Sequence, residues 1–161
     1  MGITWILCAN GSRARLFEAQ PHSDTPQEVA DFVNPAGRAH ERDLRSDAAG
    51  RLHGKAPQSS GGGSVPGASI GEHETERFAE SLRAYLERAR SEQRFGQLWI
   101  VAAPAFLGLL RRNFGKELRE MVEFELDRDF TGESPRDVFM HALEARGGEP
   151  PIGHRIDAHR P

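Results

Sequence analysis

The sequence has little of what secreted, membrane-spanning and metal-binding proteins need. It contains one cysteine in 161 residues, so an internal disulfide and a cysteine-based zinc site are both excluded. No apolar run approaches the length of about 20 residues that a membrane-spanning helix requires. The chain has no basic segment before its first apolar run, residues 3–9, and so it lacks the pattern of a signal peptide. We therefore expect a cytoplasmic protein with no membrane partner.

Lysine is also scarce, because Lys55 and Lys116 are the only lysines and the other basic residues are arginines. The net charge is −3, so the chain as a whole does not attract nucleic acid, and no DNA partner is expected. A planar guanidinium suits phosphate and RNA recognition, whereas a GC-rich coding sequence would enrich arginine without any functional cause. Both explanations stay open for the individual arginines.

Two patterns of metal and phosphate chemistry are missing as well. The seven histidines include no His-Glu-x-x-His, and no Gly-Lys-Ser/Thr follows the glycine run. Cys8 lies in an apolar run, where a thiol is unreactive. The first strands carry almost no acids, which argues against a two-metal nuclease. The residues therefore favour a binding protein over an enzyme, and they indicate no cofactor and no metal.

The sequence does contain a clear alternation of strand-like and helix-like segments. The apolar runs 3–9 and 98–103 are typical of central strands that are covered on both faces. Segment 78–89 has apolar residues at helical spacing, and Pro104 suits the first turn of a second helix. Residues 122–127 alternate between apolar and acidic side chains, which indicates a strand with one face in solvent.

These segments predict an α/β domain in the order β-β-β-α-β-α-β-α. Strands joined through a helix should be parallel, with right-handed crossovers, so the first and fourth strands should be neighbours at the centre. We therefore expect a mixed five-stranded sheet with helices on both faces. The expected strands are residues 3–9, 13–19, 28–34, 98–103 and 122–127.

The domain organisation follows from where the apolar pattern stops. We expect one domain over residues 1–148, followed by a polar tail over 149–161. Residues 35–71 have almost no apolar periodicity and include a glycine- and serine-rich run, which is typical of flexible coil. A loop of this length inside a compact domain is usually functional or disordered.

The first two strands are joined at Asn10-Gly11, a dipeptide that favours a type I′ turn with positive φ at both residues. In the strand that follows, Leu16 should face the core, whereas Arg13 and Arg15 should share the opposite face. Arg13 and Arg15 are therefore candidate phosphate-binding residues.

Residues 36–55 hold a surplus of positive charge within an acidic chain, with five basic against three acidic side chains. The basic residues are candidates for contacts with RNA phosphates, which would release counterions and weaken with salt. Alternatively, the acids pair with the arginines in an ordered turn. A third interpretation is a hydrolytic site made from His40, Asp43 and Asp47. The candidate binding residues in this segment are Arg42, Asp43, Arg45, Asp47, Arg51 and Lys55.

Three stretches, which together span most of the chain, form a specific combination. They are NGSRARLF at residues 10–17, RDLRSDAAGR at 42–51 and AAPAFLGLLR at 102–111. In this combination the sequence resembles the bacterial family named for attachment to host cells. The resemblance implies a role in attachment, without naming a partner or a chemistry.

The glycine run and the helix after it also follow a recognisable order. Gly62, Gly63 and Ser64 come first, and Arg77 and Arg83 then bound the pattern Arg-Phe-x-x-x-Leu-Arg. This order is similar to the middle domain of archaeal and eukaryotic peptide release factors, which carries Gly-Gly-Gln on a loop before such a helix. The resemblance implies a release-factor-like fold and binding to the ribosome or tRNA. Because serine replaces the glutamine and lacks its amide donors, we expect no hydrolysis of peptidyl-tRNA.

Three functional hypotheses follow from these observations. The leading one is a ribosome- or RNA-associated domain of release-factor-like fold that lacks the Gly-Gly-Gln motif. The second is an interaction protein for attachment or stress signalling, in which a protein partner orders the long loop. The third is a hydrolase that uses the loop-borne aspartates and histidine.

Overall fold

A computed structural model describes residues 2–37 and 70–151. The predictions for residues 38–69, which form most of the expected loop, and for the tail from residue 152 onward lie outside these ranges. At the two borders, residues 35–37 are helical and α2 already begins at Ile70, so the expected loop limits of 35 and 71 are too wide. The elements are β1 (Thr4–Ala9), β2 (Arg13–Glu18), β3 (Gln27–Val33), α2 (Ile70–Ser91), β4 (Gln97–Ala102), α3 (Pro104–Asn113), α4 (Lys116–Met121), β5 (Val122–Leu126) and α5 (Pro135–Ala145).

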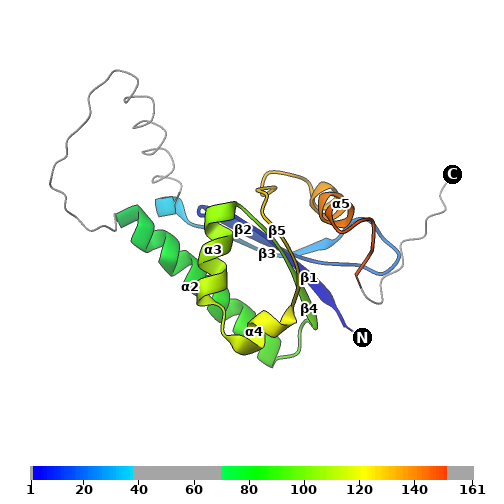
Figure 1. Cartoon of the computed structure of the whole chain (residues 1–161), viewed down its shortest axis with the longest axis horizontal. Coiled ribbons are helices and arrows are strands. Elements are labelled where there is room, and N and C mark those ends of the chain that lie inside the picture. Colours follow the sequence, from blue (N-terminus) through cyan, green and yellow to red (C-terminus); the bar gives the residue numbers. More distant parts are fainter. Residues whose placement is uncertain (1, 38–69, 152–161) are drawn as a thin grey trace, which may run out of the picture.

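The strands form a five-stranded sheet in the order β3-β2-β1-β4-β5 (Figure 1). β1 pairs in parallel with β4, and β4 pairs in parallel with β5, whereas β1–β2 and β2–β3 are antiparallel. The predicted mixed sheet and its central β1–β4 pair are thus confirmed. The central position suits these two strands because every residue of β1, and all but the first of β4, is buried.

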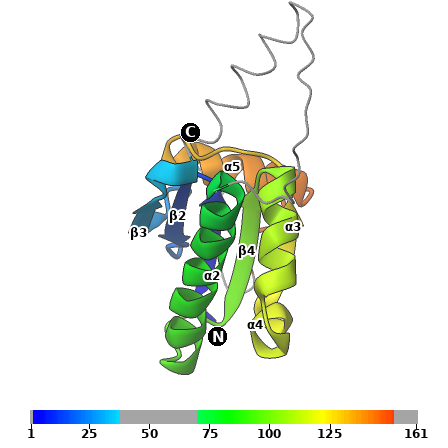
Figure 2. The same cartoon turned by 90° about the vertical axis from the view of Figure 1, so that its left-hand side faces the viewer.

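Each face of the sheet has its own apolar core. On one face, Leu7 and Leu16 pack with side chains of α2, α3 and α4. On the other face, Ile6 and Trp99 pack with side chains of α5. Figures 1 and 2 show α2, α3 and α4 together on one side of the sheet and α5 on the other. The prediction of helices on both faces is therefore confirmed.

The turn between β1 and β2 differs from the predicted type I′ turn. Within the described ranges, positive φ occurs only at His22, Gln93, Gly147 and Gly148, so neither Asn10 nor Gly11 has the conformation that a type I′ turn requires. The Asn10 side chain holds the turn instead. Its Oδ1 accepts hydrogen bonds from the backbone N–H of Ser12 and Arg13, each at 2.8 Å. An asparagine that bonds to the backbone two residues ahead is a turn former in its own right.

Two features between β4 and α5 were not predicted. The chain forms a second helix, α4, which buries only Leu118. Two apolar residues in six, Leu118 and Met121, are too few to give a detectable periodicity. In β5, the pairing with β4 shifts so that Glu123 is an extra, bulged residue between Val122 and Phe124. Glu123 accepts a hydrogen bond from Trp99 Nε1 at 2.9 Å, so the expected solvent-facing alternation is wrong at this residue.

Candidate functional site

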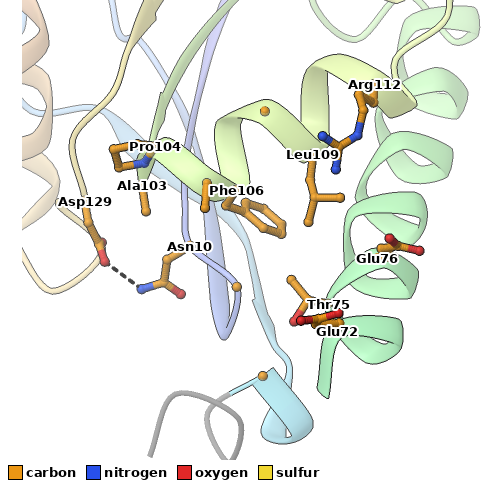
Figure 3. A pocket seen from close by; sticks show the side chains of 14 residues that line it. Asn10, Glu72, Thr75, Glu76, Ala103, Pro104, Phe106, Leu109, Arg112 and Asp129 are labelled. Atoms are coloured by element: carbon orange, nitrogen blue, oxygen red, sulfur yellow. Dashed lines mark hydrogen bonds between the residues drawn. The ribbon is translucent and has the colours of Figure 1, made fainter. Parts of the chain in front are cut away.

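A pocket of about 700 Å³ lies at the carboxyl ends of the parallel strands β1 and β4. The β1–β2 turn, the loop after β5 and the first turns of α2 and α3 surround it (Figure 3). In open α/β sheets, ligands commonly bind at the carboxyl ends of the strands. We call this pocket the carboxyl-edge groove. Its lining residues are Asn10, Gly11, Gly37, Glu72, Thr75, Glu76, Ala103, Pro104, Ala105, Phe106, Gly108, Leu109, Arg112 and Asp129.

The apolar part of the groove comes from α3. Pro104 occupies the first turn of this helix, where its missing N–H costs no hydrogen bond. Phe106 is buried, and Leu109 lies one turn further along, partly exposed to the groove. The ring of Phe106 contacts that of Phe78 in α2, with centroids 5.8 Å apart. This contact joins the two helices that form opposite walls of the groove.

A hydrogen-bonded network fixes one end of the groove. Asn10 Nδ2 donates to Asp129 Oδ2 at 2.9 Å and to Thr131 Oγ1 at 3.1 Å. Asp129 Oδ1 accepts from the backbone N–H and the hydroxyl of Thr131, at 3.0 and 2.7 Å. Desolvation acts to raise the pKa of Asp129, but these hydrogen bonds outweigh it and hold the pKa below its ordinary value. Asp129 is therefore a fixed, ionised carboxylate at the groove rim.

Charged side chains from two helices form the other rim of the groove. Glu72 and Glu76 come from α2, and Arg112 comes from the last turn of α3 (Figure 3). Among the residues that the structure describes, the side chains of Glu76 and Arg112 form no hydrogen bond or ion pair. With Asp129, the lining residues that the structure describes hold three carboxylates and one guanidinium. The groove therefore combines an apolar wall with a rim of mainly negative charge.

The described residues of the groove show no arrangement typical of nucleophilic catalysis. The hydroxyl group among them, on Thr75, donates to Gly71 O at 2.8 Å, and they include no histidine. Within the described ranges, no three histidine, cysteine or acidic side chains lie close enough together to hold a metal ion. Cys8 lies inside the sheet, and burial raises the pKa of its thiol to about 12.

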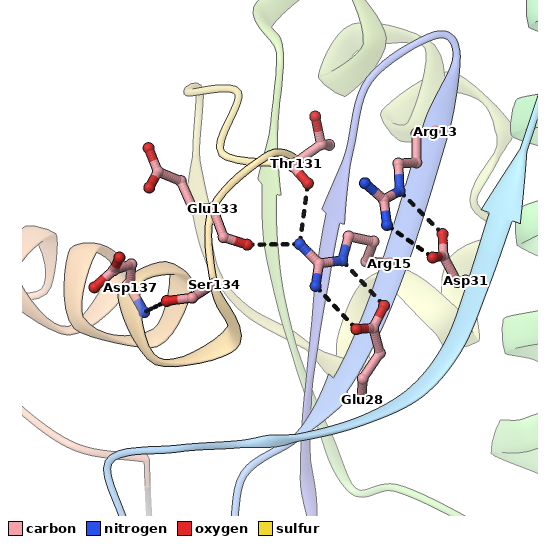
Figure 4. A network of polar contacts seen from close by, with 8 residues as sticks. All are labelled: Arg13, Arg15, Glu28, Asp31, Thr131, Glu133, Ser134 and Asp137. Atoms are coloured by element: carbon pink, nitrogen blue, oxygen red, sulfur yellow. Dashed lines mark hydrogen bonds and ion pairs between the residues drawn. The ribbon is translucent and has the colours of Figure 1, made fainter.

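Arg13 and Arg15, which the sequence offered for phosphate binding, bind carboxylates of β3 instead (Figure 4). Arg13 pairs with Asp31 at 2.8 Å. Arg15 is 8% exposed, pairs with Glu28 at 2.9 Å, and donates to the carbonyl oxygens of two residues in the loop after β5. The two arginines do share one face of β2, as expected, but the loop after β5 covers that face at Arg15. Arg15 therefore ties the loop that carries Asp129 to the sheet.

Two further predicted site residues, Arg77 and Arg83, are described by the structure and do not line the groove. Arg77 is exposed on α2 and pairs with Glu74 at 3.3 Å, and Arg83 lies two turns further along the same helix. Sequence reasoning missed the groove, although a signal existed: polar Asn10 directly follows one buried strand, and Pro104 nearly adjoins the next. The remaining candidates, Arg42, Asp43, Arg45, Asp47, Arg51, Gly62, Gly63 and Ser64, lie outside the described residues.

One serine pattern also precedes α2. Gly67, Ser69 and Gly71 have the Gly-x-Ser-x-Gly spacing of a hydrolase nucleophile elbow. In such enzymes the serine sits between a strand and a helix, whereas here a glycine-rich run comes before it. Ser69 lies outside the described residues, so we assign no hydrolase site to the pattern.

Comparison with known proteins identifies one family. Residues 5–141 match the family model described as "Protein required for attachment to host cells". This range covers the five strands of the sheet except Thr4, and it includes every described lining residue of the groove. A search of curated proteins found no match.

Proposed function

The chain belongs to the family of proteins required for attachment to host cells, and from this premise we propose that it acts in attachment as a protein-interaction module. The carboxyl-edge groove would be its binding surface. The observation that carries this proposal is the lining of the groove, in which an apolar wall on α3 faces charged side chains of α2. Such a mixture suits the recognition of a ligand with both apolar and polar parts.

The position of the groove supports the same function. Several separate parts of the chain meet there, among them the β1–β2 turn, α2, α3 and the loop after β5. Gly37 and Glu72 lie on either side of residues 38–69 along the chain, and both line the groove. A partner bound there would therefore contact the family's core fold rather than one peripheral element.

Within residues 2–37 and 70–151, no helix has the length and apolar character needed to cross a membrane.

Site-specific photo-crosslinking tests whether a protein binds in the groove. Gly108 lines it, and a Cβ at this residue would meet no atom within 4 Å, so a benzophenone amino acid fits without disturbing the core. Ala84, which is exposed on α2 outside the groove, is the matched control. We expect irradiation of the source cells to give a discrete protein adduct from position 108 and none from position 84. Equal labelling at both positions, or no adduct at 108, would contradict the proposal.

A genetic experiment tests whether the groove serves attachment. Gly108→Trp fills the groove, whereas Ala84→Trp adds the same ring to another exposed surface. In cells that lack the chromosomal gene, we expect wild type and Ala84→Trp to restore attachment to host cells and Gly108→Trp to fail. Circular dichroism and thermal unfolding of each purified variant check that the fold is intact. Full restoration by a folded Gly108→Trp would show that attachment does not use the groove.

An association with RNA or the ribosome is the second candidate function. It is favoured by the positive surplus of residues 36–55 and by the order of the glycine run and the Arg77–Arg83 helix, which is similar to release-factor middle domains. The groove itself does not favour RNA, because most of the charged side chains among its described lining residues are carboxylates. An RNA contact would therefore use the basic residues of segment 36–55, and the salt dependence of RNA binding would test it.

A further inference from the structure

We propose that the carboxyl-edge groove binds a basic, apolar peptide segment of its protein partner, in which a cationic side chain is flanked by apolar ones. This inference rests on the proposed function and goes further, because it states the chemistry of the partner. It depends on three properties of the groove: the sign of its charge, a carboxylate held in place at one end, and the apolar wall between the charged groups.

Among its described residues, the groove rim carries an excess of negative charge. Glu76 and Asp129 lie at the two rims and Arg112 at the end of α3, so the excess is negative even when Glu72 is left out. A cationic side chain is attracted to such a rim, whereas a phosphate would lie among carboxylates of its own sign. The rim groups are exposed, so the attraction should be modest and should fall as salt increases.

Asp129 is the best-placed acceptor for the cation. Asn10 and Thr131 hold its two oxygens through hydrogen bonds that favour the ionised form. Asn10 is itself fixed by the backbone of the β1–β2 turn. Within the described ranges, Asp129 forms no ion pair with a cation of this chain, and a carboxylate can accept further hydrogen bonds at its remaining lone pairs. The carboxylate is thus ready to accept a guanidinium or an ammonium group.

The wall between the rims supplies the apolar contact. Pro104, Phe106 and Leu109 follow one another along α3, between Asp129 at one end and Arg112 at the other (Figure 3). Phe106 is held against Phe78, so this wall is rigid. A peptide lying along α3 could place an apolar side chain on the wall and its basic side chain at Asp129.

The test measures the binding of fluorescein-labelled peptides by fluorescence anisotropy. One peptide alternates arginine with leucine, and its counterpart alternates glutamate with leucine. The protein is the full chain and its single-charge variants. Glu76→Gln lies in the groove, and Glu80→Gln, one turn further along α2 and also exposed, is its matched control. Arg112→Gln lies in the groove, and Arg119→Gln, exposed on α4, is the matched control for loss of positive charge.

The two groove variants should act in opposite directions. For the arginine–leucine peptide, we expect Glu76→Gln to weaken binding and Arg112→Gln to strengthen it, each by roughly 1.5- to 5-fold. The two controls should change affinity less than their partners, and Gly108→Trp should abolish binding. Tighter binding of the glutamate–leucine peptide, or inverted signs for the two groove variants, would overturn the inference and point to an anionic ligand such as RNA. Equal effects of the groove variants and their controls would also overturn it.

The outcome for this inference is separate from that for the proposed function. A protein adduct at position 108 together with charge-independent peptide binding would support the groove as an interaction surface and reject the basic peptide as its ligand. If position 108 gives no adduct, both the proposed function and this inference are rejected.

Discussion

Arg13 and Arg15 lie two residues apart on the same face of β2, and each pairs with a carboxylate of β3. Their environments differ, because the side chain of Arg13 is 35% exposed and that of Arg15 is 9% exposed. Arg15 also satisfies the carbonyl oxygens of Thr131 and Glu133. Without Arg15, the buried carbonyl oxygen of Thr131 would lose its hydrogen-bond donor, which is costly, whereas an exposed ion pair such as that of Arg13 contributes little. Variants of the two arginines therefore measure the effect of burial, because both side chains are arginines that pair with a carboxylate of β3.

We expect Arg15→Ala to lower the free energy of unfolding by roughly 2–4 kcal/mol, because Glu28 and two carbonyl oxygens would lose their donors. Arg13→Ala, the matched control, should cost about 1 kcal/mol or less. Urea unfolding followed by circular dichroism measures both values. Similar losses for the two variants would show that the contacts of Arg15 to the loop after β5 contribute nothing beyond the surface pair.

The hydrogen-bonded aspartates predict how stability depends on pH. The Arg13 guanidinium lowers the pKa of Asp31, and for Asp129 the hydrogen bonds from Asn10 and Thr131 outweigh the opposing desolvation. An unfolded aspartate titrates near pH 3.9. When the folded pKa lies below that value, the ionised carboxylate adds to the free energy of unfolding. This contribution is fully present above about pH 4 and is lost as the pH falls through the folded pKa.

We therefore expect the stability difference between wild type and Asp129→Asn to be constant from pH 7 to about pH 5 and to shrink on further acidification. The physical reason is that only the ionised aspartate accepts all of its hydrogen bonds. Unfolding curves in urea at a series of pH values measure this difference. A difference that does not change down to pH 3 would mean that the hydrogen bonds do not favour the ionised carboxylate.

At the scale of elements, the β1–β2 turn forms a junction with the residues that follow β3. Asn34 Nδ2 donates to Gly11 O at 3.0 Å, and the Asn34 N–H donates to Ser12 O at 2.8 Å. Gly37 passes so close to this turn that a Cβ would overlap with Gly11 O. Because the obstacle is backbone, it cannot move aside as a flexible side chain would. The junction therefore fixes one wall of the groove.

We expect Gly37→Ala to lower the free energy of unfolding by about 1–3 kcal/mol through this overlap. Gly108→Ala is the matched control, since it adds the same methyl group inside α3, where nothing lies within 4 Å. That substitution should raise stability by about 0.5–1 kcal/mol, because alanine favours the helix. Thermal unfolding measures both changes. Effects of the same sign would show that the close approach of Gly37 to Gly11 is not maintained in solution.

For the whole molecule, charge is distributed unevenly. The net charge is −3 and residues 36–55 carry a positive surplus of two, with five basic and three acidic side chains. Among the described residues, the groove rim has an excess of the opposite sign. The groove and segment 36–55 would thus select different partners, a cationic segment in the groove and an anion at residues 36–55. The RNA hypothesis concerns only the second.

If residues 36–55 meet RNA phosphates, Arg45→Glu and Arg51→Glu should weaken binding and reduce the slope of log affinity against log salt by roughly 1 for each lost contact. The measurement is RNA or ribosome binding across a salt series. Arg88→Glu is the control, because Arg88 is an arginine whose side chain is 81% exposed on α2. Unchanged affinity and slope in both loop variants, with the fold intact, would remove the main support for RNA binding.

The order of strands and helices could be predicted from the sequence because it depends on local patterns. The uniform burial of β1 and β4 follows from their uninterrupted apolar runs. The last helix begins where Ser134 Oγ accepts from the Asp137 N–H, and it ends before glycines with positive φ at 147 and 148. Short-range spacing was sufficient for all of these.

Only the tertiary structure decided the turn, the bulge and the site. Asn10-Gly11 has the residues of a type I′ turn, but Asn10 bonds to its own turn and to Asp129, which lies 119 positions away. From its sequence neighbours Arg15 is expected at the surface, but in the folded chain the loop after β5 covers it and accepts its hydrogen bonds. The groove assembles side chains from distant segments that meet where the parallel strands end. By itself, the sequence determined which segments become strands and helices, because that depends on near neighbours. The folded chain decided which side chains face solvent and which face one another, because that depends on contacts between residues far apart in sequence.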